Sequence, residues 1–216
     1  RNRKPAEQTA ADIRSHGQQA LVVKADIGTD EGLDHFFKEV ENNFGGLDIL
    51  VNNAASGYIR PALKQKPKGW DWTMNINARS LLFSAQRAVP LMTERGGGFI
   101  VSVSSAGSTH VLPDYVVVGA SKAALEALTR YLAVELADKN IIVNAVSPGV
   151  ADTDALQHCD ATQEGRGIQS VLDKTPAGRL VSPDDIAQVV AFLCSPAAAM
   201  IRGQVIIIDG GYTLRL

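Results

Sequence analysis

Short apolar runs rich in β-branched residues recur along the chain and constrain its fold more than any other feature. Each run is short enough for a strand, and polar residues or glycines bound it. Strands that are buried on both faces read as near-continuous apolar runs, so the pattern predicts a parallel sheet covered by helices. The runs occupy residues 19–27, 47–54, 96–105, 141–149 and 204–211.

Stretches with helical periodicity separate these runs. The predicted helices cover residues 5–16, 30–43, 70–94, 114–138 and 182–195. The last begins at a serine cap, Ser182, followed by proline and two acidic residues. Strands that alternate with helices predict an α/β fold with a doubly wound parallel sheet. Residues 1–216 are enough for a single domain, and residues 152–181 interrupt the alternation with a polar stretch.

Composition and charge exclude several classes of protein. The formal net charge is −2, which gives no reason to expect a nucleic acid or a membrane surface as partner. No apolar run is long enough to span a bilayer. Cys159 and Cys194 form neither a disulfide framework nor a metal motif, so a reducing cytoplasm fits best. His158 and Cys159 have no partner at ligand spacing, and we expect no metal site.

Polar clusters stand at or just beyond the ends of the predicted strands. They are Asp26, Asn52–Ser56, Ser102–Ser105 and Ser147–Gly149. In open α/β sheets, ligands bind beyond the carboxyl ends of the strands, so we expect these clusters to converge on one crevice. The G-x-G-x-x-G fingerprint of dinucleotide-binding proteins is absent from the sequence.

Two further polar or aromatic features have structural interpretations. Asn77 is expected to bond main chain inside its own helix. Trp70 and Trp72, at a predicted helix start, are interpreted as packing or interface residues rather than substrate contacts.

The stretch YVVVGASKAALEAL, residues 115–128, raises the central functional question. Tyr115 and Lys122 are separated by six small or apolar residues. In a continuous helix the two would lie two turns apart on one face, at about 10.5 Å. A core tyrosine beside a lysine that extends to solvent is one interpretation. The other is a catalytic hydrogen-bond donor with an electrostatic partner that holds a different part of the same ligand.

Over almost its whole length the sequence resembles the short-chain dehydrogenase/reductase family. The matching stretches, in order, are DILVNNA, MNINA, IVSVSS, the SK of the lysine helix, VNAVSPGVADT and GQVIIIDGG. Such enzymes normally begin with a strand, a glycine-rich turn, a helix and a second strand. The resemblance implies a Rossmann-type, doubly wound parallel sheet whose first βαβ portion is missing here. Arg1 would then fall just after the second strand.

The spacing of Tyr115 and Lys122 is similar to that of the enoyl-acyl-carrier-protein reductases. Most of the family has tyrosine four residues before the lysine, where this sequence has Val118, which cannot transfer a proton. The strings NNAASG, WDWTMNINA, SKAALEALTRYLAVEL, DTDAL, TPAGR and MIRGQ resemble the NADPH-dependent type III branch of bacterial enoyl reductases. The implied activity is reduction of the 2,3-double bond of an enoyl thioester in fatty-acid synthesis, with the acyl group on acyl carrier protein or coenzyme A.

Two alternatives stay open beside this activity. One is another short-chain reductase, acting on a dienoyl thioester, a 3-oxoacyl thioester or a ketone. The other is a non-catalytic cofactor-binding scaffold, because the glycine-rich unit that would cradle the cofactor pyrophosphate is absent from this sequence.

The resemblance also implies roles for individual residues. Tyr115 would donate to the thioester carbonyl or its enolate, Lys122 would bind the nicotinamide ribose, and Ser105 would line the substrate pocket. Arg1 suits the 2′-phosphate of NADPH. A homotetramer through helices 70–94 and 114–138 is expected. The implied cofactor-binding residues are Arg1, Asn2, Asp26, Ile27, Asn53, Ala54, Ala55, Lys122, Ala151, Asp152 and Thr153.

Overall fold

The computed structural model describes residues 3–151 and 166–215, and its centre is a four-stranded parallel sheet. The strands lie side by side in chain order, β1-β2-β3-β4, and every neighbouring pair is parallel. The strands are β1 (Ile49–Asn52), β2 (Gly98–Val103), β3 (Ile141–Pro148) and β4 (Val205–Ile208).

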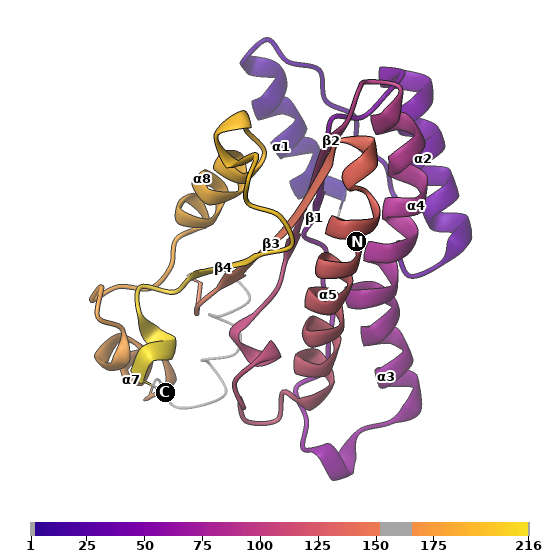
Figure 1. The fold of residues 1–216 in the computed structure, drawn as a ribbon. Coiled ribbons are helices and arrows are strands. Elements are labelled where there is room, and N and C mark those ends of the chain that lie inside the picture. The colour runs from indigo at the N-terminus through magenta and orange to yellow at the C-terminus, as the bar shows by residue number, and fades with distance from the viewer. Residues whose placement is uncertain (1–2, 152–165, 216) are drawn as a thin grey trace.

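Helices connect the strands and cover the sheet. α4 and α5 lie against one side of the sheet and α8 lies against the other (Figure 1). No helix in the described ranges combines the length and the apolar character that crossing a membrane requires. The helices are α1 (Arg3–Ser15), α2 (Asp30–Phe44), α3 (Pro67–Met74), α4 (Ser80–Thr93), α5 (Val116–Glu135), α7 (Arg166–Lys174) and α8 (Pro183–Leu193).

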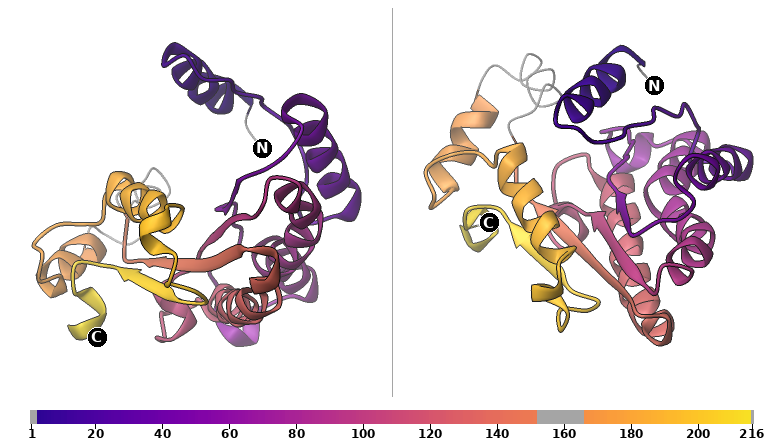
Figure 2. Two further views of the ribbon diagram at one scale, coloured as in Figure 1. Left: turned by 45° about the horizontal axis from the view of Figure 1, so that its top comes forward. Right: turned by 90° about the horizontal axis from the view of Figure 1, so that it is seen from above.

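The strands contribute side chains to two apolar layers, one on each face of the sheet, because successive side chains of a strand point to opposite faces. Ile100 and Val143 belong to the larger layer, with side chains of α2, α4 and α5. Val101 and Val146 belong to the smaller layer, with Leu193 of α8. The prediction of a parallel sheet with helices on both faces is therefore confirmed, and Figure 2 shows the same layering from two further directions.

The predicted strand at residues 19–27 is wrong. This segment runs as irregular chain, and its Leu21 side chain is exposed. A strand is stabilised by hydrogen bonds to a neighbouring strand. In the described part of the chain, β1 pairs only with β2, and residues 19–27 pair with no strand. The apolar side chains of β1 on this open edge, Ile49 and Val51, are 43% and 45% exposed.

One helical prediction also needs correction. The segment predicted as one helix over 70–94 begins earlier, as α3, and passes through a π-helical turn at Asn75–Arg79 before α4. Such turns insert one residue into a helix and re-aim the side chains around it. The polar stretch 152–181, which interrupts the predicted alternation, contains α7 in its described part. The capping motif predicted for α8 is confirmed, because the Ser182 hydroxyl accepts the backbone N–H of Asp185.

Candidate active site

The carboxyl ends of the strands meet at one edge of the sheet. Asn52 at the end of β1 is in register with Ser102, and Val103 at the end of β2 is in register with Val146 of β3. Residues 53–55 follow β1 directly and are exposed, and Ser104 and Ser105 follow β2. The polar ends of β1, β2 and β3 therefore lie side by side, and their convergence on one crevice with Asp26 stays a prediction.

Tyr115 stands at the N-cap of α5 rather than inside the helix. Its hydroxyl oxygen lies 3.4 Å from the hydroxyl oxygen of Ser105. Its ring packs against Gly107, where an added Cβ would lie 2.5 Å from two ring carbons. The Tyr115 ring can therefore pack in this position only because residue 107 is glycine.

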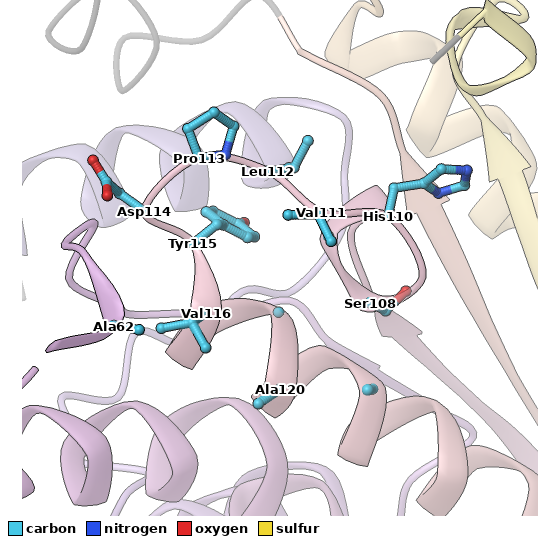
Figure 3. A pocket seen from close by; sticks show the side chains of 13 residues that line it. Ala62, Ser108, His110, Val111, Leu112, Pro113, Asp114, Tyr115, Val116 and Ala120 are labelled. Carbon is cyan, nitrogen blue, oxygen red and sulfur yellow. The ribbon is translucent and has the colours of Figure 1, made fainter.

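Tyr115 also forms one wall of a cavity of about 390 Å³. Figure 3 shows its ring beside Val111 and Leu112, above the first turns of α5. The other walls are mostly apolar, with polar groups from Ser108, His110 and Asp114. The candidate donor therefore borders a largely apolar space. The lining residues are Ala62, Gly107, Ser108, His110, Val111, Leu112, Pro113, Asp114, Tyr115, Val116, Gly119, Ala120 and Ala123.

Lys122 is buried on the side of α5 that faces the sheet. Its side chain is only 5% exposed, and Nζ donates to the backbone oxygen of Val103 at 2.6 Å. Burial lowers the pKa of the ammonium to about 8. Lys122 therefore does not extend to solvent as a surface lysine would. Its ammonium is fixed at the carboxyl end of β2.

A buried carboxylate lies one helical turn beyond Lys122. Glu126 is 7% exposed, and one of its oxygens accepts hydrogen bonds from the hydroxyls of Ser104 and Ser108, both at 2.6 Å. These bonds attach α5 to the loop that carries Ser105. The sequence patterns did not single out this group. The signal available was a glutamate four residues after Lys122, on the same face of an apolar helix.

Asn77 makes a second polar connection beneath the site, from within the π-helical turn. Its side chain accepts the N–H of Ser56 and donates to the Ser56 carbonyl, each at 2.8 Å. It also donates to the hydroxyl of Ser121 on α5. The expectation that Asn77 bonds main chain within its own helix is wrong. It joins the loop after β1 to α5.

Val118 occupies the place where the resemblance expects the usual tyrosine, and it is buried. A Cβ added to Gly57 would collide with its side chain, so the loop after β1 closes directly over it. The backbone N–H of Arg60 then donates to the carbonyl of Asp114, next to Tyr115. The loop after β1 and the loop before α5 therefore form one connected surface.

The structure places only some of the predicted cofactor-binding residues. Asp26 is exposed, and one of its carboxylate oxygens accepts the N–H of Gly28 in a tight turn. Ile27 packs against the larger apolar layer, and Ala151 forms an isolated bridge with Val181. Within residues 3–151 and 166–215, no group of three or more metal-ligating side chains gathers. Six residues named in the sequence predictions lie outside the described ranges: Arg1, Asn2, Asp152, Thr153, His158 and Cys159.

Comparison with known proteins identifies the family. A family model described as enoyl-(acyl carrier protein) reductase matches residues 1–213. The chain belongs to the short-chain dehydrogenase/reductase family. It is therefore a member of a family of oxidoreductases, as the resemblance implied.

Individual relatives show what the chain is similar to. It is 38% identical to 1-cyclohexenylcarbonyl-CoA reductase of Streptomyces collinus, over 97% of this chain and 74% of that protein. A 7α-hydroxysteroid dehydrogenase complexed with NADH and 7-oxo glycochenodeoxycholic acid superposes with a TM-score of 0.90 at 33% identity, over 95% of this chain and 79% of that chain. A gluconate 5-dehydrogenase from Burkholderia cenocepacia J2315, in complex with NADP and tartrate, gives a TM-score of 0.90 at 28% identity, over 100% and 84%.

The buried ammonium of Lys122 predicts a pH-dependent stability. Between pH 8 and 10.5 the Lys122 side chain carries a proton in the unfolded chain but not in the folded chain. The free energy of unfolding therefore increases with pH through that window. Lys122→Met lacks the titrating group. The wild type should therefore gain about 3 kcal/mol in free energy of unfolding relative to Lys122→Met between pH 8 and 10.5. Urea unfolding of both proteins at several pH values measures the difference. A difference that is constant with pH would contradict the assignment.

Because the Tyr115 ring packs against Gly107, we predict that substitutions at the two positions have coupled effects on the free energy of unfolding. The backbone of Gly107 is not in the left-handed region, so alanine is excluded by space rather than by conformation. Gly107→Ala should lower the free energy of unfolding by about 1–3 kcal/mol. In a Tyr115→Ala background the ring is absent, and the loss should be much smaller. Equal losses in both backgrounds, measured by urea unfolding, would show that the ring does not rest on Gly107.

Proposed function

We propose that the protein is an NADPH-dependent enoyl thioester reductase of fatty-acid synthesis, which reduces the 2,3-double bond of its substrate. The observation that carries the proposal is the placement of Tyr115, Val118 and Lys122. A phenol stands at the entrance of α5, an aliphatic side chain fills the usual position, and the lysine is fixed at the end of β2.

The chemistry of an enoyl thioester suits this arrangement. Addition of hydride to the β-carbon leaves an enolate, whose oxygen needs a hydrogen-bond donor. The hydroxyl of Tyr115 can donate to that oxygen, and Ser105 lies within reach of the same hydroxyl. The largely apolar cavity beside Tyr115 supports the proposal, because an acyl chain requires apolar walls.

Lys122 is assigned to the nicotinamide ribose. An ammonium has three N–H donors, and one of them is used by the carbonyl of Val103. The remaining donors suit the ribose hydroxyls. The bound nicotinamide would supply the hydride. A nucleotide at this edge can reach residues 53–55, which follow β1 directly and are exposed, and the Asp26 carboxylate is exposed as well.

Further contacts to the nucleotide follow from the resemblance. We propose that Asp26 and Ile27 hold adenine, and that Asn53, Ala54 and Ala55 contact the adenosine ribose and the pyrophosphate. Ala151, Asp152 and Thr153 would contact the nicotinamide amide, and Arg1 and Asn2 the phosphorylated ribose.

The relatives support the proposal in different degrees. The Streptomyces collinus protein is named for a reaction on an unsaturated acyl thioester of coenzyme A, and the matching family is described as enoyl-(acyl carrier protein) reductase. A second candidate, reduction of a ketone, is favoured by the hydroxysteroid and gluconate dehydrogenases among the solved structures and by the placement of the Ser105 hydroxyl beside that of Tyr115. NADPH oxidation with a crotonyl thioester beside a 3-oxoacyl thioester separates the two candidates. Turnover of neither would favour a non-catalytic scaffold.

We also propose a cytoplasmic homotetramer that associates through α4 and α5. The outward side of α5 carries two apolar residues that are largely exposed in the single chain, Tyr131 at 69% and Val134 at 78%. Exposed apolar side chains of this kind are typical of subunit interfaces.

Replacement of Tyr115 should affect turnover far more than cofactor binding. The phenolic hydroxyl is assigned to the developing enolate oxygen, so its benefit arises mainly in the transition state. Tyr115→Phe should lower kcat on a crotonyl thioester about a hundred- to a thousandfold, with little change in the Kd of NADPH. Lys122→Ala is the comparison, and it should weaken NADPH binding as well as turnover. Intact turnover in Tyr115→Phe would place the donor elsewhere.

Cofactor choice follows from the cations at the start of the chain. Arg1, with Arg3 and Lys4 beside it, is assigned to the 2′-phosphate, and a charge-assisted contact of this kind contributes about 1.5–3 kcal/mol. The full-length protein should therefore have a kcat/KM for NADPH about ten- to a hundredfold above that for NADH. Arg1→Gln should reduce this ratio. Equal values for both cofactors in the wild type would refute the assignment.

A further inference from the structure

A second cavity, lined by cations and aromatic rings, lies beside the loop that follows β1. It has a volume of about 390 Å³. The cationic residues are Arg60, Lys66 and Lys68, and the aromatic residues are Tyr58 and Trp72. Gln65 and Gly69 complete the lining. No residue proposed to contact the cofactor or the acyl group lines this cavity.

The cavity has a local charge opposite to that of the whole chain. Residues 53–70 contain four cations, Arg60, Lys64, Lys66 and Lys68, and no acidic residue, although the formal net charge of the chain is −2. The ion pairs found among the described residues include none of these four. Positive groups that converge on a hollow without internal carboxylate partners favour an anionic ligand.

The aromatic side chains narrow the class of anion. The guanidinium carbon of Arg60 lies 5.6 Å from the centre of the Tyr58 ring, and the Tyr58 ring also packs against Gly69. The indole N–H of Trp72 donates to the hydroxyl of Ser56, which fixes that ring at the cavity wall. Aromatic faces stack on nucleobases, and arginine and lysine bind phosphates. Together they suit a nucleotide that carries phosphate groups.

The cavity adjoins the candidate active site through one loop. Tyr58, Arg60 and Gln65 face the basic cavity, whereas Ala62 of the same loop lines the apolar cavity beside Tyr115. The backbone N–H of Arg60 donates to the carbonyl of Asp114, the residue before Tyr115. A ligand with one end at Tyr115 can therefore extend across this loop to the basic cavity.

We infer that this cavity binds the 3′-phosphoadenosine diphosphate end of a coenzyme A thioester, with Arg60, Lys66 and Lys68 on its phosphates. The inference rests on the proposed function, since it names the carrier of the same acyl substrate. A hollow with aromatic walls suits a nucleotide better than it suits the convex surface of a carrier protein. The flexible pantetheine arm of coenzyme A would cross the loop to the thioester.

The first test compares thioesters that differ only in the carrier. In the full-length protein, kcat/KM should be about five- to twentyfold higher for crotonyl-CoA than for crotonyl-3′-dephospho-CoA. Lys66→Gln/Lys68→Gln should remove this preference. The matched control Lys38→Gln/Lys139→Gln, at exposed lysines of α2 and the turn after α5, should retain it. A preference that survives in Lys66→Gln/Lys68→Gln would overturn the inference.

The second test does not depend on turnover. Adenosine 3′,5′-bisphosphate should bind in the presence of saturating NADP⁺, which occupies the proposed cofactor site, and Lys66→Gln/Lys68→Gln should weaken that binding about five- to twentyfold. Calorimetry measures both. Absence of binding, or equal binding by the variant, would overturn the inference.

Two further outcomes separate the inference from the proposed function. If crotonyl-N-acetylcysteamine and crotonyl-CoA are both left unreduced while the bisphosphate binds as expected, the proposed function fails and the nucleotide site stands. If crotonyl thioesters are reduced but only crotonyl-acyl carrier protein loses kcat/KM in Lys66→Gln/Lys68→Gln, an acidic carrier protein uses these lysines and the coenzyme A inference is wrong.

Discussion

The attachment of α5 to the carboxyl end of β2 supports every other part of the candidate site. Two buried polar groups on one face of the helix make this attachment. Lys122 donates to the carbonyl of Val103, and Glu126 accepts from Ser104 and Ser108. Buried charged groups are costly unless their hydrogen bonds are made, so these contacts fix the helix in one position relative to the strand. Tyr115 owes its position to this helix, because it stands at the helix start.

The loops around the site depend on the same helix. Asn77 connects the loop after β1 to Ser121, and Gly57 of that loop closes over Val118. Gly119 approaches the carbonyl of Gly107 so closely that an added Cβ would lie 2.5 Å from it. Small residues at these contacts let three segments, far apart in the sequence, meet around Tyr115. The phenol, the apolar cavity and the basic cavity consequently lie in one continuous region.

The proposed chemistry separates two tasks that most of the family places on adjacent turns of a helix. Val118 takes no part in proton transfer, and it fills space beneath the loop after β1. The donor is instead assigned to Tyr115, outside the helix, whereas the ammonium stays buried at the strand end. This division suits a substrate whose developing negative charge needs a hydrogen bond rather than a strongly acidified phenol.

By itself, the sequence determined the α/β class, the four paired strands and the short-chain reductase family. These features depend on local hydrophobic period and on motifs that keep their order along the chain. The sequence could not show that residues 19–27 lack a partner strand, because pairing depends on a neighbour in space. Only the tertiary structure decided that Glu126 joins two serines and that Asn77 reaches Ser56. These side chains meet residues about twenty positions away, and no local pattern encodes such contacts.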